Sequence, residues 1–223
     1  DVILSSANNY YENVTQAEVE AYYSALTSLN ANDPSPISYG LNSKLMRNDN
    51  GTITEQVWKV GGMYSEAIEQ IVYWLEKAAS VADFMQRRII ETLIDYYKTG
   101  DLSTFDRYNI LWVNDNRSKV DFVNGFIETY GDPLGRKASW ESIVNFRDER
   151  ACRRTEILTE YAQWFEDNAP IDPAYRKTKV KGVSAKVITV AMLGGDCYPA
   201  TPIGINLPNA DWIRKEHGSK SVT

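Results

Sequence analysis

The chain has 223 residues, of which 43% are hydrophobic and 12% aromatic, enough to build one large or two small folded domains. Its net charge of −6 disfavours nucleic-acid binding, which usually needs a basic face. We therefore expect no nucleic-acid partner. We also expect no membrane partner, because no apolar run approaches the roughly 20 residues of a membrane span.

The N-terminal third predicts one helix followed by a short β-hairpin. Thr15 and Glu18 have the spacing of a capping box and precede apolar residues at helical intervals. The proline-containing segment that follows ends this helix. We then expect a strand over residues 37–41 and a turn at 49–51 that leads into a second strand over 52–60.

Three helices are predicted next, from their apolar stripes. The first contains Ile68 to Leu75, the second contains Phe84 to Tyr97 and stops at Gly100, and a shorter one begins near Ser103. These stripes predict core packing, because apolar residues at helical spacing usually face another helix or a sheet.

The C-terminal half alternates strands with one long helix. The pattern predicts strands over 120–130, 140–146 and 181–192, a helix over 148–167, and a last short strand that ends at Asn206. This mixture of helical hairpins and strands indicates an α+β fold.

The strand over 120–130 contains a carboxylate in an unusual position. Side chains alternate across a strand, so Phe122, Phe126, Glu128 and Tyr130 are expected on one face. Burial of a carboxylate beside two phenylalanines is costly unless a partner or a ligand satisfies it. The alternative is that Glu128 emerges into solvent at the strand end. In a strand, Glu128 and Tyr130 would lie roughly 7 Å apart.

Two asparagines flank Pro208 near the chain end, after the apolar run that precedes Asn206. An asparagine amide both donates and accepts hydrogen bonds, so Asn206 and Asn209 suit a charged group with several donors, such as a peptide's α-ammonium. Asn209 could instead be an ordinary N-cap of the helix that follows it.

Together these segments resemble the dipeptidyl peptidase III family of zinc-dependent exopeptidases, in its bacterial branch. The matching residues are Phe126-Ile-Glu-Thr-Tyr-Gly-Asp-Pro133 and Gly204-Ile-Asn-Leu-Pro-Asn209. Further likeness is carried by Leu111 to Asp115, Ile37 to Ser43 and Gly218 to Val222, so the resemblance covers most of the chain.

The resemblance implies a role for each matching residue. Glu128, Asn206 and Asn209 would bind the substrate's α-ammonium, and Tyr130 would donate a proton to the oxyanion at the scissile carbonyl. The backbone around Pro202, Gly204 and Ile205 would offer a sheet edge to an oligopeptide substrate. Tyr39, Asn42 and Trp112 match family positions near the cleft, and we interpret them as structural.

The chain departs from the family pattern at the metal. The family's His-Glu-x-x-Gly-His motif is missing, and the only histidine is His217, whereas catalytic zinc needs about three protein ligands. We therefore expect an internal fragment that binds no zinc and is inactive alone, with zinc held elsewhere in the complete protein. A cytoplasmic location is expected, with a secreted or periplasmic one left open.

The resemblance also implies a division into lobes. Residues 1–147 and 176–223 would belong mainly to a substrate-binding lobe that contains a small β-barrel-like sheet, and residues 148–175 would join the zinc-bearing lobe. Without that partner lobe, an exposed apolar stripe on the helix could let copies of the fragment associate.

The alternative function is a non-catalytic α+β module that binds peptides or acts as a scaffold. A third possibility, an enzyme that uses these carboxylates alone, lacks a paired constellation.

Overall fold

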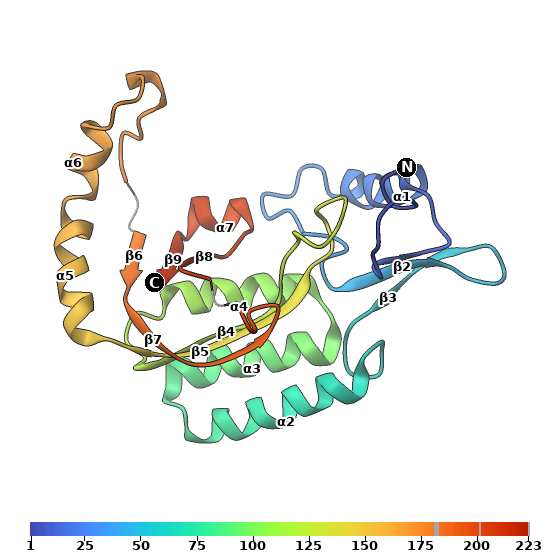
Figure 1. Cartoon of the computed structure of the whole chain (residues 1–223), viewed down its shortest axis with the longest axis horizontal. Coiled ribbons are helices and arrows are strands. Elements are labelled where there is room, and N and C mark those ends of the chain that lie inside the picture. Colours follow the sequence, from blue (N-terminus) through green and yellow to red (C-terminus); the bar gives the residue numbers. More distant parts are fainter. Residues whose placement is uncertain (181–182, 201, 223) are drawn as a thin grey trace. The chain divides into compact units, whose positions relative to one another are not determined.

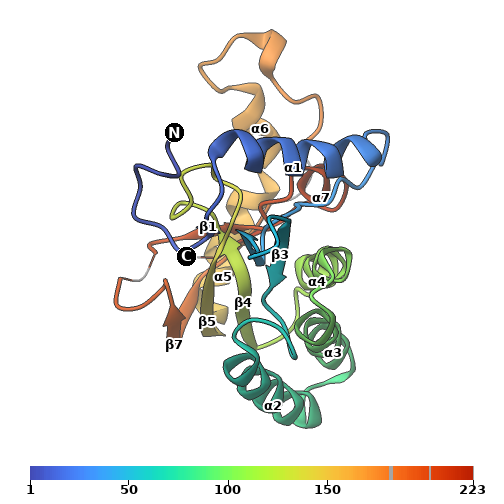
Figure 2. The ribbon, with the colours of Figure 1, turned by 90° about the vertical axis from the view of Figure 1, so that its right-hand side faces the viewer.

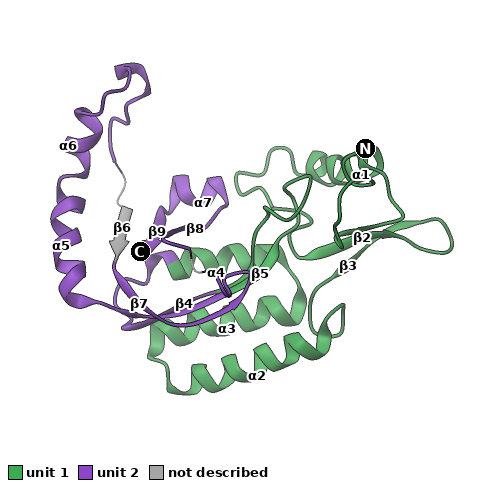
Figure 3. Cartoon of the chain, in the orientation of Figure 1, with its two compact units in different colours: residues 1–112, 124–141 green, residues 113–123, 142–223 purple. Residues whose placement is uncertain are grey.

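In the computed structural model of the chain, residues 1–180, 183–200 and 202–222 are described. The chain divides into two compact units (Figure 3). Unit 1 contains residues 1–112 and 124–141, and unit 2 contains residues 113–123 and 142–223. Strands β4 (Val120–Glu128) and β5 (Ser139–Arg147) each have residues in both units.

The first part of unit 1 is helix α1 (Gln16–Leu29) with the three-stranded sheet β1-β2-β3. The capping box of Thr15 and Glu18 is present at the start of α1, as predicted. In the sheet, β2 (Ser43–Arg47) pairs in parallel with β1 (Tyr11–Glu12) and antiparallel with β3 (Ile53–Val57). The core between helix and sheet consists of Ile3, Tyr11, Val14, Val19, Tyr23 and Leu45.

The prediction of a strand over 37–41 is wrong, because the first strand of the hairpin begins at Ser43. The Tyr39 amide donates to the Ile37 carbonyl and the Leu41 amide to the Ser38 carbonyl. These backbone groups are therefore used in turns rather than in a ladder. The predicted hairpin turn is confirmed, since the Asn48 amide donates to the Thr52 carbonyl across it.

Three helices complete the first part of the chain: α2 (Ser65–Val81), α3 (Phe84–Thr99) and α4 (Leu102–Asn114). Figures 1 and 2 show them side by side. Ile89, Leu93, Ile94 and Tyr97 of the predicted stripe on α3 are buried, whereas Phe84 at its start is exposed, so core packing is confirmed from Ile89 onward. The helix is capped by Gly100, whose φ of 73° is left-handed. Glycine adopts this conformation without the steric cost that other residues incur, which explains the predicted C-cap.

Strand β4 pairs with β5, and β5 in turn pairs with β7 (Ile188–Gly195). A Cβ atom on Gly125 would lie 2.9 Å from the Phe105 ring, so only glycine lets β4 approach α4 this closely. The burial alternation changes here, because Gly125 and Phe126 are both buried. The strand ends at Glu128 and Tyr130 lies in the following turn, so the predicted strand was two residues too long. The 7 Å spacing expected of a strand therefore does not apply to this pair.

Unit 2 contains most of the C-terminal elements. The helix expected over 148–167 is interrupted at Tyr161, between α5 (Glu149–Glu160) and α6 (Ala162–Asp167), and a short 3₁₀ turn, η1, spans Pro173–Tyr175. The strand expected over 181–192 is two strands, β6 (Val183–Lys186) and β7, while Lys181 and Gly182 lie outside the described residues.

The chain then forms β8 (Ile205–Leu207), helix α7 (Asp211–Glu216) and β9 (Ser219–Val222). Strand β9 is the centre of the third sheet, in the order β6-β9-β8.

The α+β class is confirmed. The described strands form three separate sheets of three strands each, and none of them closes into a barrel. The barrel-like arrangement is therefore not found in the part of the chain that the structure describes. None of the helices within the described ranges is long and apolar enough to cross a membrane.

Candidate functional site

Glu128 and Tyr130 lie at the end of β4 and in the turn after it, both in unit 1. The Glu128 side chain is half-buried, whereas Tyr130 is 92% exposed. Within the described residues, neither the Glu128 carboxylate nor the Tyr130 hydroxyl has a hydrogen-bond partner. The Glu128 backbone is fixed, because its carbonyl accepts a hydrogen bond from Ser139 Oγ at 3.3 Å. The result is two polar side chains without a hydrogen-bond partner among the described residues, close together in the sequence.

Aromatic side chains hold the strand that precedes Glu128. The buried Phe126 ring lies 4.8 Å from the Trp58 ring and 6.5 Å from the Tyr97 ring, centroid to centroid. The Tyr97 hydroxyl bonds to Asn124 Oδ1 on β4 and accepts from Trp140 Nε1 on β5 at 2.8 Å. Helix α3 therefore connects both strands through one phenol, which limits how far Glu128 can move.

The turn after Tyr130 is organised by the carboxylate of Asp132. Its Oδ1 accepts from the Leu134 amide, and its Oδ2 accepts from the amides of Arg136 and Lys137 at 2.8 and 2.7 Å. The Tyr11 hydroxyl also donates to Oδ2 at 2.8 Å. A carboxylate with four donors is well compensated for its burial, so Asp132 ties this turn to β1.

Asn206 and Asn209 lie in unit 2, at and beyond β8. Both residues are exposed. Asn206 faces Ser221 in the antiparallel pairing with β9, and its side chain has no hydrogen-bond partner among the described residues. Helix α7 begins after Ala210, which makes no side-chain cap, so Asn209 is not its N-cap residue.

Pro202, Gly204 and Ile205 lead into β8, which is the outer strand of its sheet. Pro202 and Gly204 are exposed, and Ile205 opens the pairing with Val222 of β9. In the described part of the chain, β8 pairs on one side only. Such a strand has backbone groups available for an added extended segment. The neighbouring Thr201 lies outside the described residues.

A metal centre does not fit the described residues. No group of three histidine, cysteine, aspartate or glutamate side chains within those ranges could hold a metal ion. His217 ends α7 and contacts the Trp212 ring edge-on at 6.1 Å, centroid to centroid.

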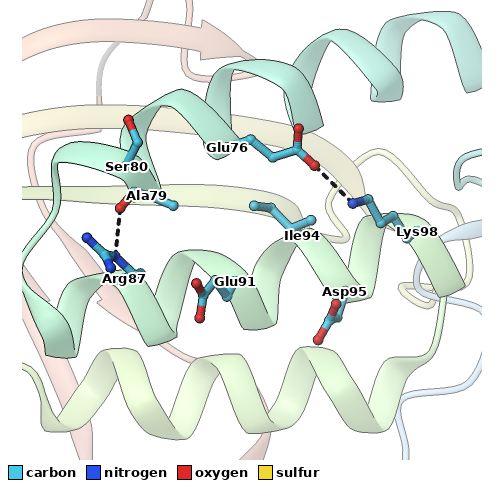
Figure 4. A pocket seen from close by; sticks show the side chains of 8 residues that line it. All are labelled: Glu76, Ala79, Ser80, Arg87, Glu91, Ile94, Asp95 and Lys98. Carbon is cyan, nitrogen blue, oxygen red and sulfur yellow. Dashed lines mark hydrogen bonds and ion pairs between the residues drawn. The ribbon is translucent and has the colours of Figure 1, made fainter.

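A separate groove of about 540 Å³ lies on α2 and α3 in unit 1 (Figure 4). Two contacts cross it: Lys98 Nζ pairs with Glu76 at 3.0 Å, and Arg87 Nε donates to the Ala79 carbonyl at 2.9 Å. These contacts join the two helices, so we interpret the groove as a structural junction.

Sequence reasoning missed two buried lysines, Lys137 and Lys220. Burial lowers the pKa of Lys137 to about 8. Lys220 on β9 pairs with Asp121 of β4. Lys220 could have been found, because it lies two residues before the buried Val222 and therefore on the same face of the strand. Lys137 lies in an irregular segment and gives no such signal.

Comparison with known proteins matches residues 11–223 to peptidase family M49. The chain is 28% identical over 222 residues to human dipeptidyl peptidase 3 and 29% identical over 163 residues to the rat protein. It covers 29% and 22% of those two proteins, and 99% and 73% of its own length is aligned. The chain thus spans less than a third of the curated relatives it matches.

A solved structure, DPP III from Caldithrix abyssi, shares the fold. The TM-score is 0.79 at 24% sequence identity, and the match covers 96% of this chain and 40% of that one.

Proposed function

The chain belongs to peptidase family M49, and we propose that it is the substrate-binding part of a longer zinc-dependent dipeptidyl peptidase. The complete protein would release dipeptides from the free N-terminus of oligopeptides. One observation carries this proposal: the Glu128 carboxylate is half-buried, lies on a fixed backbone and has no partner among the described residues. A carboxylate in that state suits a cationic ligand, and the α-ammonium of a peptide is such a ligand.

Three acceptors would bind the three ammonium protons, namely the Glu128 carboxylate and the amide oxygens of Asn206 and Asn209. The bond to Glu128 is charge-assisted and should contribute about 1.5–3 kcal/mol, more than either neutral amide. The exposure of Asn206 and Asn209 supports this assignment.

The peptide would bind along β8. Pro202, Gly204 and Ile205 would provide backbone groups to an extended peptide that adds to the sheet. The position of β8 at the outside of its sheet supports this role. Proline fits an edge position, because it has no amide hydrogen to contribute to a ladder.

Tyr130 would stabilise the reaction. Its hydroxyl would donate a hydrogen bond to the oxyanion that forms at the scissile carbonyl. The 92% exposure of Tyr130 and the anchored turn after it support this role, since the phenol can reach a ligand from a fixed backbone.

The zinc ligands would come from another part of the complete protein. Residues 1–147 and 176–223 would belong mainly to the substrate-binding lobe, and any barrel-like sheet there would need further strands. Residues 148–175 would join the zinc-bearing lobe. The exposed apolar side chains on this segment support that contact: Ile157, Leu158, Tyr161, Trp164, Phe165 and Tyr175.

The test is dipeptide release from a peptide with a free α-amine by the complete protein, compared with its Glu128→Ala variant. We expect release that a chelator abolishes and that the variant loses by about 10- to 100-fold in kcat/KM. The isolated chain should bind peptide weakly and release nothing. Peptide binding without release by the complete wild-type protein would favour the non-catalytic peptide-binding module.

A further inference from the structure

Lys137 is completely buried, and its ammonium group has a full set of acceptors in unit 1. Nζ donates to Tyr23 Oη at 2.6 Å, to the Gly40 carbonyl at 3.2 Å and to Ser43 Oγ at 3.2 Å. An ammonium has three protons, so these three acceptors satisfy it. The ring centroid of Tyr23 also lies 4.9 Å from Nζ.

The hydrogen bonds around Lys137 have a consistent direction. The Tyr23 hydroxyl donates to Glu55 Oε1 at 2.7 Å, and the Ser43 hydroxyl donates to the same oxygen at 2.6 Å. Each hydroxyl can therefore accept from Lys137 and donate to Glu55. Two hydroxyls thus connect a buried cation to a half-buried carboxylate on β3, which fixes the rotamers of all four side chains.

The Lys137 backbone is bound to the turn that contains Tyr130. Its amide donates to Asp132 Oδ2 at 2.7 Å, and the Asp132 amide donates to the Thr129 carbonyl at 3.1 Å. On the other side, the Ala138 amide donates to the Leu41 carbonyl at 2.9 Å. Residues 129–138 are therefore attached to the rest of unit 1 through Lys137, Asp132 and Ala138.

We propose that Lys137 is a positioning residue, whose buried ammonium holds the turn so that the Tyr130 hydroxyl stays at the place where it donates to the oxyanion. A buried cation is costly unless it is fully hydrogen-bonded, and an apolar residue of similar volume would fill the same space without that cost. We therefore infer that the Lys137 charge is retained because its hydrogen bonds fix the turn that contains Tyr130. This inference rests on the proposed role of Tyr130.

The test is a double-mutant cycle in the complete protein with Lys137→Met and Tyr130→Phe. We expect Lys137→Met to lower kcat about 10-fold with less than a threefold change in KM. In the Tyr130→Phe background it should have almost no effect, because no hydroxyl remains to be positioned. Equal losses in both backgrounds would overturn the proposal.

Two further variants separate positioning from general damage. Lys98→Met removes a lysine that is half exposed and paired with Glu76, and it should leave kcat unchanged. If Lys137→Met does not fold, Ser43→Ala removes one acceptor of the ammonium and should lower kcat in the same direction by a smaller factor. A normal kcat in a folded Ser43→Ala variant would contradict the proposal, and so would equal losses of kcat in folded Lys98→Met and Lys137→Met variants.

Amide hydrogen exchange tests the same inference without activity. Lys137→Met should speed exchange in residues 129–137 and leave α2 unchanged, even if the complete protein releases no dipeptides. Lack of release by wild type would refute the proposed function, and lack of local exchange change would refute the positioning role. The two failures are therefore distinguishable.

Discussion

Lys220 Nζ donates to Asp121 Oδ2 at 3.0 Å, in an ion pair whose side chains are 0% and 7% exposed. The pair joins β9 to the first half of β4, and both residues belong to unit 2. Strand β9 also pairs with β8, where Leu207 is the partner of Lys220. Within unit 2, the strand that contains Asn206 is therefore connected through β9 to the first half of β4.

Breaking this pair should destabilise unit 2. Lys220→Met leaves Asp121 buried without its cation, which typically costs 3–5 kcal/mol. Replacing both partners in Lys220→Met/Asp121→Leu should recover most of that loss, because neither member of the pair is then left buried without the other. Denaturant unfolding of the chain measures both. The matched control is Lys215→Met, which removes an exposed lysine and should change stability by no more than about 0.5 kcal/mol. A loss as large in the double variant as in the single one would contradict the expectation.

The stability of unit 1 should fall as the pH rises toward neutrality. Burial, with a smaller contribution from Asp101, raises the pKa of Asp106 to about 7 from its ordinary value of 3.8. Its Oδ2 has no hydrogen-bond partner among the described residues. The folded state therefore binds the proton more tightly than the unfolded state, so the stabilisation is complete below pH 4 and is lost as the pH rises through 7.

Between pH 5 and 8 the ionisation of Asp106 should remove roughly 2–3 kcal/mol from the free energy of unfolding. Asp106→Asn should abolish that part of the slope, and Asp95→Asn, at an exposed position on α3, should retain it. Unfolding curves at several pH values measure the slope. The explanation fails if the slope is the same in wild type and Asp106→Asn.

Asn206 should affect peptide binding without affecting stability. Its exposed side chain has no partner in the described part of the chain, so Asn206→Ala should change the free energy of unfolding by less than about 0.5 kcal/mol. Loss of one hydrogen bond to the ammonium should raise the Kd of a free-amine peptide by about 2- to 10-fold. Asn32→Ala, at another exposed position, is the control. Equal affinities for wild type and Asn206→Ala would remove Asn206 from the site.

The elements with strong local signals were predictable from sequence. The capping box at Thr15 and the glycine after α3 are local patterns, and both are confirmed. The apolar stripe of α3 is confirmed from Ile89 onward, but not at the exposed Phe84. The strand expected over 37–41 failed because turn hydrogen bonds took its backbone groups, which apolar content does not reveal. The end of β4 at Glu128 was also missed, since Thr129 and Tyr130 both favour strands by composition.

The candidate site was predictable only through its motifs. Glu128, Tyr130, Asn206 and Asn209 were recognisable as parts of a family pattern, and their roles stay predictions. The hydrogen bonds around Lys137 join it to residues 94 to 114 positions away along the chain. No periodicity within one segment encodes a contact of that range, so the packing of α1 and β2 had to be known first.

The central claim is that Glu128 recognises a free α-amine, and substrate acetylation tests it most directly. The kcat/KM of the complete protein should be compared for one oligopeptide with a free and with an acetylated N-terminus, in wild type and in Glu128→Gln. We predict that acetylation abolishes dipeptide release by wild type, and that Glu128→Gln lowers release from the free peptide about 10- to 100-fold. Efficient release of an acetylated dipeptide by wild type would contradict the account.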